Sequence, residues 1–156
     1  MSCTSTDALA SHVDLASTIP LLAGAREIPE TMSGVDLSPV LADPTTSVRD
    51  HILFAQDSAW YESCIPTRYA MRGIFDGRHK YTRYYGVGGG TTPFGTRSNK
   101  PKLYDVDAAF EDHDHEFYDL QEDPGELVNL ANDRGHRAEV RDRFAHLIDV
   151  EATNFS

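Results

Sequence analysis

Apolar residues recur along this chain with helical or alternating spacing, and each spacing predicts one kind of element. In the N-terminal part they recur at helical intervals, at Leu15, Ile19, Leu22 and Ala23. A proline is tolerated only in the first turn of a helix, so Pro20 places the predicted start near Ser17 or Thr18, either of which can cap it. Gly24 ends the helix. Residues 28–39 are predicted to form an extended connection.

The middle of the chain is predicted to be rich in strands. The predicted strands are His51–Asp57, which we expect to be short and buried, Tyr69–Asp76, Arg78–Tyr85 and Glu116–Leu120. Asp76 and Gly77 form a strong turn signal, which makes the second and third strands a hairpin. Alternation along the third strand places Tyr81, Arg83 and Tyr85 on one face of the sheet. Lys80, Thr82 and Tyr84 then lie on the other face.

The last element predicted is a helix over Arg137–Ala152. Its apolar stripe consists of Val140, Phe144, Leu147 and Ile148, at positions i, i+4, i+7 and i+8. A helix of this length is marginal alone in water, so it needs the sheet as a packing partner. The predicted fold class is therefore α+β, a small antiparallel β-sheet packed by a C-terminal helix.

Composition and charge narrow the function classes. The 156 residues are 40% hydrophobic and 10% aromatic, which suits a folded domain and not a disordered tail. A formal net charge of −11 argues against nucleic acid and anionic membranes as partners. No apolar run approaches the roughly 20 residues of a membrane span, and no signal peptide is visible, so we expect a cytoplasmic protein. Cys3 and Cys64 are expected to be free thiols.

Six ordered sequence segments carry a family resemblance. They read SHVDLASTIPLLAG, PETMSGVDL, HILFAQD, MRGIFDGRHKY and EFYDLQEDPGELVNLA, followed by the Arg137–Ala152 helix. In this order the chain resembles the C-terminal portion of type I sulfatases, in the alkaline phosphatase superfamily. Ser17 stands where that family commonly has proline, and Phe117 where it commonly has leucine.

The resemblance implies an architecture and a missing partner. Residues 1–43 would be the terminal helix and connection of the large sulfatase domain, and residues 44–156 the C-terminal subdomain. The implied partner is the missing N-terminal sulfatase domain, and a sulfate ester would be bound as substrate only in the intact enzyme. The apolar face of the first helix would then lack its cover in this chain, which predicts an exposed apolar patch.

The resemblance also implies where the chemistry lies. The family uses an early Asp-Asp pair for calcium, a formylglycine made from the cysteine of CxPxR, and a later Asp-His-Gly or Asp-Asn element. These lie upstream of the region matched by SHVDL, and this chain contains no Asp-Asp pair and no Asp-His-Gly. We therefore expect no catalytic and no metal-binding residue in this chain. Calcium and formylglycine are implied for the intact family member only.

One motif imitates the family's nucleophile. Residues 63–68, SCIPTR, contain CxPxR, which would make Cys64 the modified nucleophile and Arg68 its stabiliser. The alternative is a loop that leads into the next strand. We favour the loop, because Ile65 replaces the small residue after the cysteine and the surrounding order places the segment in the C-terminal sheet.

Four other clusters have a functional and a structural interpretation. His113, Asp114 and His115 could ligate a metal, but we favour a solvated charged loop. The glycines of 86–90 lack the Lys-Ser/Thr of a phosphate loop, so we favour a hairpin loop. Tyr81, Tyr84 and Tyr85 could line a cleft, but we favour strand packing. Arg72, Arg78, Lys80 and Arg83 could bind an anion, but we favour pairing with the acidic run Asp105–Glu126.

The turn Asp123–Glu126 is predicted to be structural. Pro124 fixes the turn, and Leu127, Leu130 and Ala131 are expected to bury against the sheet. Leu130→Asp should therefore destabilise the domain severely, and an unchanged melting temperature would contradict this packing.

Three functional hypotheses follow. The first is a sulfatase C-terminal portion that is not catalytic by itself. The second is a stand-alone binding or regulatory module derived from a sulfatase. The third is a minimal enzyme that uses Cys64.

Overall fold

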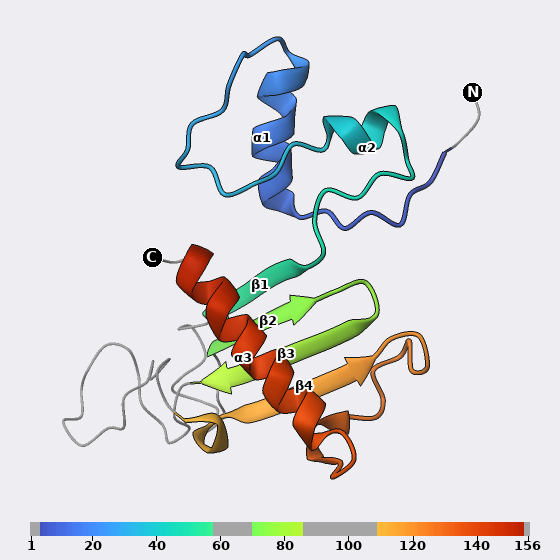
Figure 1. Ribbon diagram of the computed structural model, residues 1–156, viewed down its shortest axis with the longest axis vertical. Helices are drawn as coiled ribbons and strands as arrows, with labels where there is room; N and C mark the ends of the chain where they lie inside the picture. Colours follow the sequence, from blue (N-terminus) through green and yellow to red (C-terminus); the bar gives the residue numbers. More distant parts are fainter. Residues whose placement is uncertain (1–3, 58–69, 86–108, 155–156) are drawn as a thin grey trace, which may run out of the picture. The chain divides into compact units, whose positions relative to one another are not determined.

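The fold divides into two units, which are described separately below. A computed structural model of the chain describes residues 4–57, 70–85 and 109–154. The first unit covers residues 1–52 and the second residues 53–156 (Figure 1).

The first unit is built around helix α1, His12–Leu22. The predicted start near Ser17 or Thr18 is wrong. Ser11 is the N-cap, and the Asp14 carboxylate accepts its backbone N–H at 2.6 Å, so the start signal lies almost two turns earlier and Pro20 falls inside the helix. The predicted end is confirmed: Gly24 has φ +97°, and the N–H of Ala25 bonds to the Pro20 carbonyl at 2.9 Å.

The buried side of α1 is polar. Asp14, Ser17 and Thr18 are buried, and their side chains bind the backbone of residues 34–37. Ser17 Oγ donates to the Gly34 carbonyl at 2.9 Å, and Asp14 Oδ1 accepts the N–H of Val35 at 2.9 Å. Asp14 also forms an ion pair with Arg49. These bonds satisfy the buried polar groups and hold the connection against the helix.

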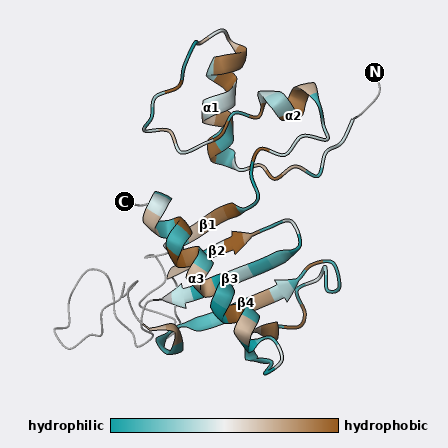
Figure 2. Ribbon diagram, viewed as in Figure 1, coloured by the Kyte–Doolittle hydropathy of each residue, from teal (hydrophilic) through white to brown (hydrophobic). Residues whose placement is uncertain are grey.

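The outward side of α1 is apolar. Leu15, Ile19 and Leu22 are 50%, 61% and 61% exposed, and brown hydrophobic segments mark the helix in Figure 2. The predicted exposed apolar patch is confirmed. A surface helix normally turns this stripe toward a core, so α1 has the opposite arrangement.

A second helix interrupts the connection that was predicted to be extended. This is α2, Ser38–Ala42, with Pro39 in its first turn and the Asp36 carboxylate accepting the N–H of Ser38 at 2.9 Å. The extended prediction is wrong for Ser38 and Pro39, because a proline at a helix start favours the helix.

The second unit contains a four-stranded sheet in the order β1-β2-β3-β4. The strands are β1 (Ile52–Asp57), β2 (Ala70–Phe75), β3 (His79–Tyr85) and β4 (Asp114–Asp119). The pairs β2–β3 and β3–β4 are antiparallel, with Ile74, Tyr81 and Phe117 in register across three strands. The hairpin prediction is confirmed, and Gly77 has φ +95° in its turn. The expectation of a buried first strand is wrong, because β1 lies at the edge of the sheet and Ala55 and Gln56 are exposed.

Helix α3, Arg137–Asn154, packs on one face of the sheet (Figure 1). The core consists of Ile74, Tyr81, Phe117, Val140 and Leu147. Phe144 and Leu130 pack against its margin, which agrees with the predicted stripe and with the role given to Leu130. Two short 3-10 helices, η1 (Phe110–Asp112) and η2 (Leu130–Asn132), complete the unit. The α+β fold class is confirmed.

Candidate functional site

An open cavity of about 550 Å³ lies in the second unit. It is formed by the beginning of β4, by η1 and η2, and by the start of α3. Its wall includes aromatic and imidazole rings as well as charged groups, namely Tyr84, Phe110, His113, His115, Arg134 and Arg137. This volume lies in the range of small-molecule sites, so the cavity is the candidate site of the described chain.

Two hydrogen bonds fix His115 in the cavity wall. Tyr81 and His115 lie 2.8 Å apart from Oη to Nδ1, and His115 Nε2 lies 2.8 Å from the Phe110 carbonyl oxygen. Because a carbonyl only accepts, Nε2 carries the hydrogen and Nδ1 accepts from the tyrosine. Burial raises the pKa of Tyr81, so its hydroxyl stays a donor. The Phe110 ring stacks on the imidazole with 4.1 Å between centroids.

The His113-Asp114-His115 motif is part of the folded wall. Asp114 and His115 belong to β4, and His113 is only 6% exposed, with its ring 5.7 Å from that of Phe144. The prediction of a solvated loop is wrong here, because aromatic neighbours draw both imidazoles inward. In the described part of the chain no three His, Cys, Asp or Glu side chains come together as metal ligands.

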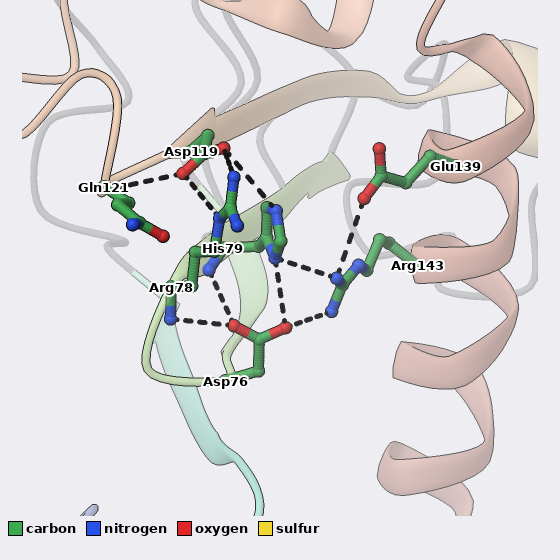
Figure 3. A network of polar contacts seen from close by, with 7 residues as sticks. All are labelled: Asp76, Arg78, His79, Asp119, Gln121, Glu139 and Arg143. Carbon is green, nitrogen blue, oxygen red and sulfur yellow. Dashed lines mark hydrogen bonds and ion pairs between the residues drawn. The ribbon is translucent and has the colours of Figure 1, made fainter.

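A network of charges joins the hairpin turn to α3 (Figure 3). The Asp76 carboxylate accepts the N–H groups of Arg78 and His79 at 2.9 and 2.6 Å and pairs with Arg143 at 2.5 Å. Burial raises the pKa of Asp76, but the bonds from His79, Arg78 and Arg143 outweigh it and lower the pKa to about 2. Arg143 Nη2 also lies 3.1 Å from His79 Nδ1, so that nitrogen accepts. The network fixes α3 against the hairpin.

The basic residues of the hairpin find partners in two different places. Arg78 binds Asp119 through two bonds of 3.0 and 2.5 Å, which lowers the pKa of Asp119 to about 2, and Lys80 binds Glu126 at 2.6 Å. The predicted pairing with the acidic run is confirmed for these two. Arg83 instead is fully buried and pairs with Glu151 of α3. Its partner lies 68 residues away, which no local pattern shows.

The three tyrosines divide between the two interpretations. Tyr81 is buried in the core, which confirms strand packing for this residue. Tyr84 lines the cavity, and its hydroxyl donates to Glu116 at 3.0 Å. Burial, and next the Glu116 carboxylate, raise the pKa of Tyr84 to about 12. The side chain of Tyr85 lies outside the described part, and the predicted alternation holds for residues 80–84.

The segment after the acidic turn covers the free edge of β4. The Asn129 side chain accepts the N–H of Phe117 at 3.1 Å and donates to the His115 carbonyl at 3.0 Å. It also accepts the N–H of Ala131 at 2.9 Å. The side-chain amide thus pairs with the edge groups of β4 in the way that a neighbouring strand would. Leu130 and Ala131 are half-buried against the core as predicted. The prediction for Leu127 is wrong: it is 85% exposed, because Glu126 takes φ +53° and turns the chain outward.

Several predicted positions lie outside the described residues. These are Cys3, the 63–68 motif with Cys64 and Arg68, and the glycines of 86–90. No helix of the described chain has the length and apolar character needed to span a bilayer.

Comparison with known proteins gives one sequence relative and a set of similar structures. No family model matches the chain. Arylsulfatase A of Bos taurus is 35% identical over 128 residues, which are 81% of this chain and 23% of that protein. Among solved structures, a 2-O GAG sulfatase matches with a TM-score of 0.62 at 23% identity, over 92% of this chain and 25% of its own. The phosphonate monoester hydrolase of Agrobacterium radiobacter matches with a TM-score of 0.60 at 20% identity, over 94% and 26%.

These matches define the class of protein. The fold is a part of the sulfatase fold, and the chain spans about a quarter of the length of the relatives that it matches. Over 128 residues the chain is homologous to a part of a sulfatase, arylsulfatase A.

Proposed function

We propose that this chain supplies the C-terminal part of a sulfatase, a sulfuric ester hydrolase, and is not catalytic by itself. It completes the fold and helps to shape the substrate cleft, while the nucleophile and the calcium ligands come from an N-terminal domain. The observation that carries this proposal is that α1 exposes its apolar side and buries its polar side. The sequence relation to arylsulfatase A supports the reaction class.

The exposed apolar side of α1 indicates that another domain covers this helix in the intact protein. Three large apolar side chains on α1, Leu15, Ile19 and Leu22, are at least half exposed, whereas the polar side is buried. Because each of these side chains is still half exposed, covering them would add roughly half of the 1.5–3 kcal/mol that complete burial of such a side chain contributes. We assign residues 1–43 to the large domain and residues 44–156 to the C-terminal subdomain, so that the large domain covers this face.

The test is to ask what accompanies the chain in its native source. An antibody against the second unit would be used to purify the protein and to assay it with p-nitrophenyl sulfate. We expect the activity to reside in a polypeptide longer than this chain, or in a complex with a second polypeptide. Replacing Leu15, Ile19 and Leu22 with serine should abolish that activity without lowering the melting temperature of the second unit.

Two controls sharpen the test. Leu127→Ser with Val128→Ser removes an equally exposed apolar pair from the second unit and should leave the activity intact. Activity in the purified 156-residue chain that Cys64→Ala abolishes would overturn the proposal in favour of the minimal enzyme.

A second candidate is a stand-alone binding module. The closed core between the sheet and α3, together with the cavity beside it, favours this alternative. A monomer that melts cooperatively and binds no hydrophobic dye would support the module and contradict the missing neighbour.

A further inference from the structure

His79 begins β3 and lies between the hairpin turn and α3 (Figure 3). Its ring stacks on Phe117 with 5.6 Å between centroids, and its side chain is 20% exposed. The ring nitrogen Nδ1 lies 3.1 Å from Arg143 Nη2 and 3.4 Å from Asp76 Oδ2, and Nε2 lies 3.8 Å from Asp119 Oδ2. Each ring nitrogen therefore faces a carboxylate, and Nδ1 also faces a guanidinium.

The neutral ring bonds to α3. Arginine only donates, so Nδ1 carries no hydrogen while it accepts from Arg143, and the ring hydrogen lies on Nε2, which faces Asp119. Asp76 Oδ2 accepts from Arg143 Nη1 at 2.5 Å. Arg143 thus bonds both to the carboxylate of the turn and to the imidazole of β3, and it links α3 to the hairpin twice.

The protonated ring bonds differently. A proton on Nδ1 removes the acceptor for Arg143 and places two cations side by side. The imidazolium then donates to Asp76 Oδ2 from Nδ1 and faces Asp119 with Nε2. Because the Coulomb energy falls with distance, two attractions over 3.4 and 3.8 Å outweigh one repulsion over 3.1 Å. The ring therefore keeps its place on the sheet, and the bond that is lost is the one from Arg143.

The other charged groups near the ring do not change this balance. Arg78 pairs with Asp119, and Glu139 of α3 lies 3.7 Å from Arg143 Nη2. One adds a positive and the other a negative charge, and each acts through a group that already faces the ring. A second imidazole, that of His136 before α3, lies 6.3 Å from the phenyl ring on which the first one stacks.

From this geometry we propose that His79 is a pH-sensitive switch in the fold of the second unit. Uptake of a proton from solvent moves the Nδ1 bond from Arg143 of α3 to Asp76 of the turn, and the middle of α3 loosens on the sheet. Imidazole is the side chain whose charge ordinarily changes between pH 5 and pH 8. The switch lies within the second unit and does not depend on the proposed sulfatase function.

The experiment is a titration of the ¹³C,¹⁵N-labelled full chain from pH 8 to pH 5, followed by NMR. The bonds described above lower the pKa values of Asp76 and Asp119 to about 2, so both stay ionised throughout. At pH 8 we expect the ring of His79 to carry its hydrogen on Nε2 alone. On acidification Nδ1 should gain a proton, and the amides of Glu139 and Arg143 should shift with the same midpoint.

Hydrogen exchange measures the loosening of α3. The protection of the amides of residues 140–144, corrected for the intrinsic effect of pH on exchange, should fall about two- to tenfold between pH 8 and pH 5. This range corresponds to the loss of one ordinary hydrogen bond.

Two variants separate the switch from a merely structural role of the histidine. Arg143→Gln removes the positive neighbour, so the ring should take up its proton at a higher pH, and the amides of α3 should no longer follow it. His79→Gln keeps a polar side chain that does not titrate, so the pH dependence of α3 protection should disappear. His12→Gln, at an exposed position of the first unit, is the control and should leave the response of α3 unchanged.

Three results would overturn the proposal. The first is a ring of His79 that keeps one protonation state from pH 8 to pH 5, and the second is a hydrogen on Nδ1 already at pH 8. The third is a loss of α3 protection that persists in His79→Gln. The first two are read in the native chain, so the test does not depend on the folding of a variant.

Discussion

At the scale of single residues, this chain depends on side chains that bond to backbone. Asp14 and Thr18 hold the N–H groups of Val35 and Leu37, and Asn129 holds both an N–H and a carbonyl of β4. Such bonds are individually modest, but a buried backbone group that loses its partner costs about 1–3 kcal/mol. Single substitutions at these positions therefore have large expected effects.

Gly34 should not tolerate a side chain. A Cβ at this position would lie 2.1 Å from the Val13 carbonyl oxygen, which is a backbone atom of α1 that cannot turn aside. Gly34→Ala should push the connection away from α1 and cost about 1–3 kcal/mol of stability in the first unit. Hydrogen exchange at the amides of Val35 and Leu37 measures this, and we expect their protection to fall.

The matched control for Gly34 is its exposed neighbour, Ser33→Ala. It should leave the exchange of both amides unchanged. Full protection of Val35 and Leu37 in Gly34→Ala would show that the close approach is not required.

Asn129→Asp should weaken the edge of the sheet. The substitution preserves shape but removes the Nδ2 donor to the His115 carbonyl, so that carbonyl loses its partner. We expect a loss of about 1–3 kcal/mol, measured by urea unfolding at pH 7. Asn132→Asp, an exposed neighbour, serves as the control and should be nearly neutral; equal effects of the two variants would contradict the role given to Asn129.

At the scale of elements, the hairpin turn and α3 depend on each other. Asp76 closes the β2–β3 turn and also pairs with Arg143, and Arg83 in the middle of β3 pairs with Glu151 near the end of α3. The helix is thus fixed by one ion pair in each of its halves and by the apolar core with Val140 and Leu147. Removing either pair should loosen the packing of α3 before the sheet itself unfolds.

The Asp76 network predicts a specific acid sensitivity. Its pKa is lowered to about 2 in the folded chain from an ordinary value of 3.8. A lowered folded pKa means that the contribution to stability is present above about pH 4 and is lost as the pH falls toward 2. We expect the stability difference between the native chain and Asp76→Asn to shrink over this window, as measured by urea unfolding at several pH values.

The control for this acid effect is Asp142→Asn, an exposed carboxylate on α3. Its difference from the native chain should be small and nearly constant with pH. A difference for Asp76→Asn that stays constant between pH 5 and pH 2 would rule out the Asp76 contribution.

At the scale of the whole molecule, the two units differ in how complete they are. The second unit closes a core between the sheet and α3, whereas the first unit exposes the apolar side of its main helix. Contiguous exposed apolar surface of this kind marks an interaction site. The first unit is therefore where we expect a neighbouring domain to bind.

The isolated chain should bind a hydrophobic dye through α1. Replacing Leu15, Ile19 and Leu22 with serine should remove most of the dye fluorescence and any self-association. Thermal unfolding of the second unit should not change, because none of the three side chains belongs to its core. Dye binding that persists in this variant would place the exposed apolar surface elsewhere.

Much of the fold could be predicted from the sequence because its signals are local. The Asp76-Gly77 turn, the alternation along residues 80–84 and the 3.6-residue stripe at Val140, Phe144 and Leu147 are each contained within a few residues. The predicted start of α1 was wrong because the cap at Ser11 outweighs the effect of Pro20, which lies nine residues further along the chain.

The features that only the tertiary structure determined are contacts between residues far apart in the chain. The burial of His113, the pairing of Arg83 with Glu151 and the cavity beside α3 arise when β3, β4 and α3 meet, since each residue finds its partner on another element. The exposure of Leu127 could not be predicted either, because it follows from the left-handed backbone of Glu126, which turns this apolar side chain into solvent. The sequence by itself determined the elements, their order and the resemblance to sulfatases, whose ordered motifs are local. Which side chains meet depends on packing across the sheet, and no single segment of the sequence contains that information.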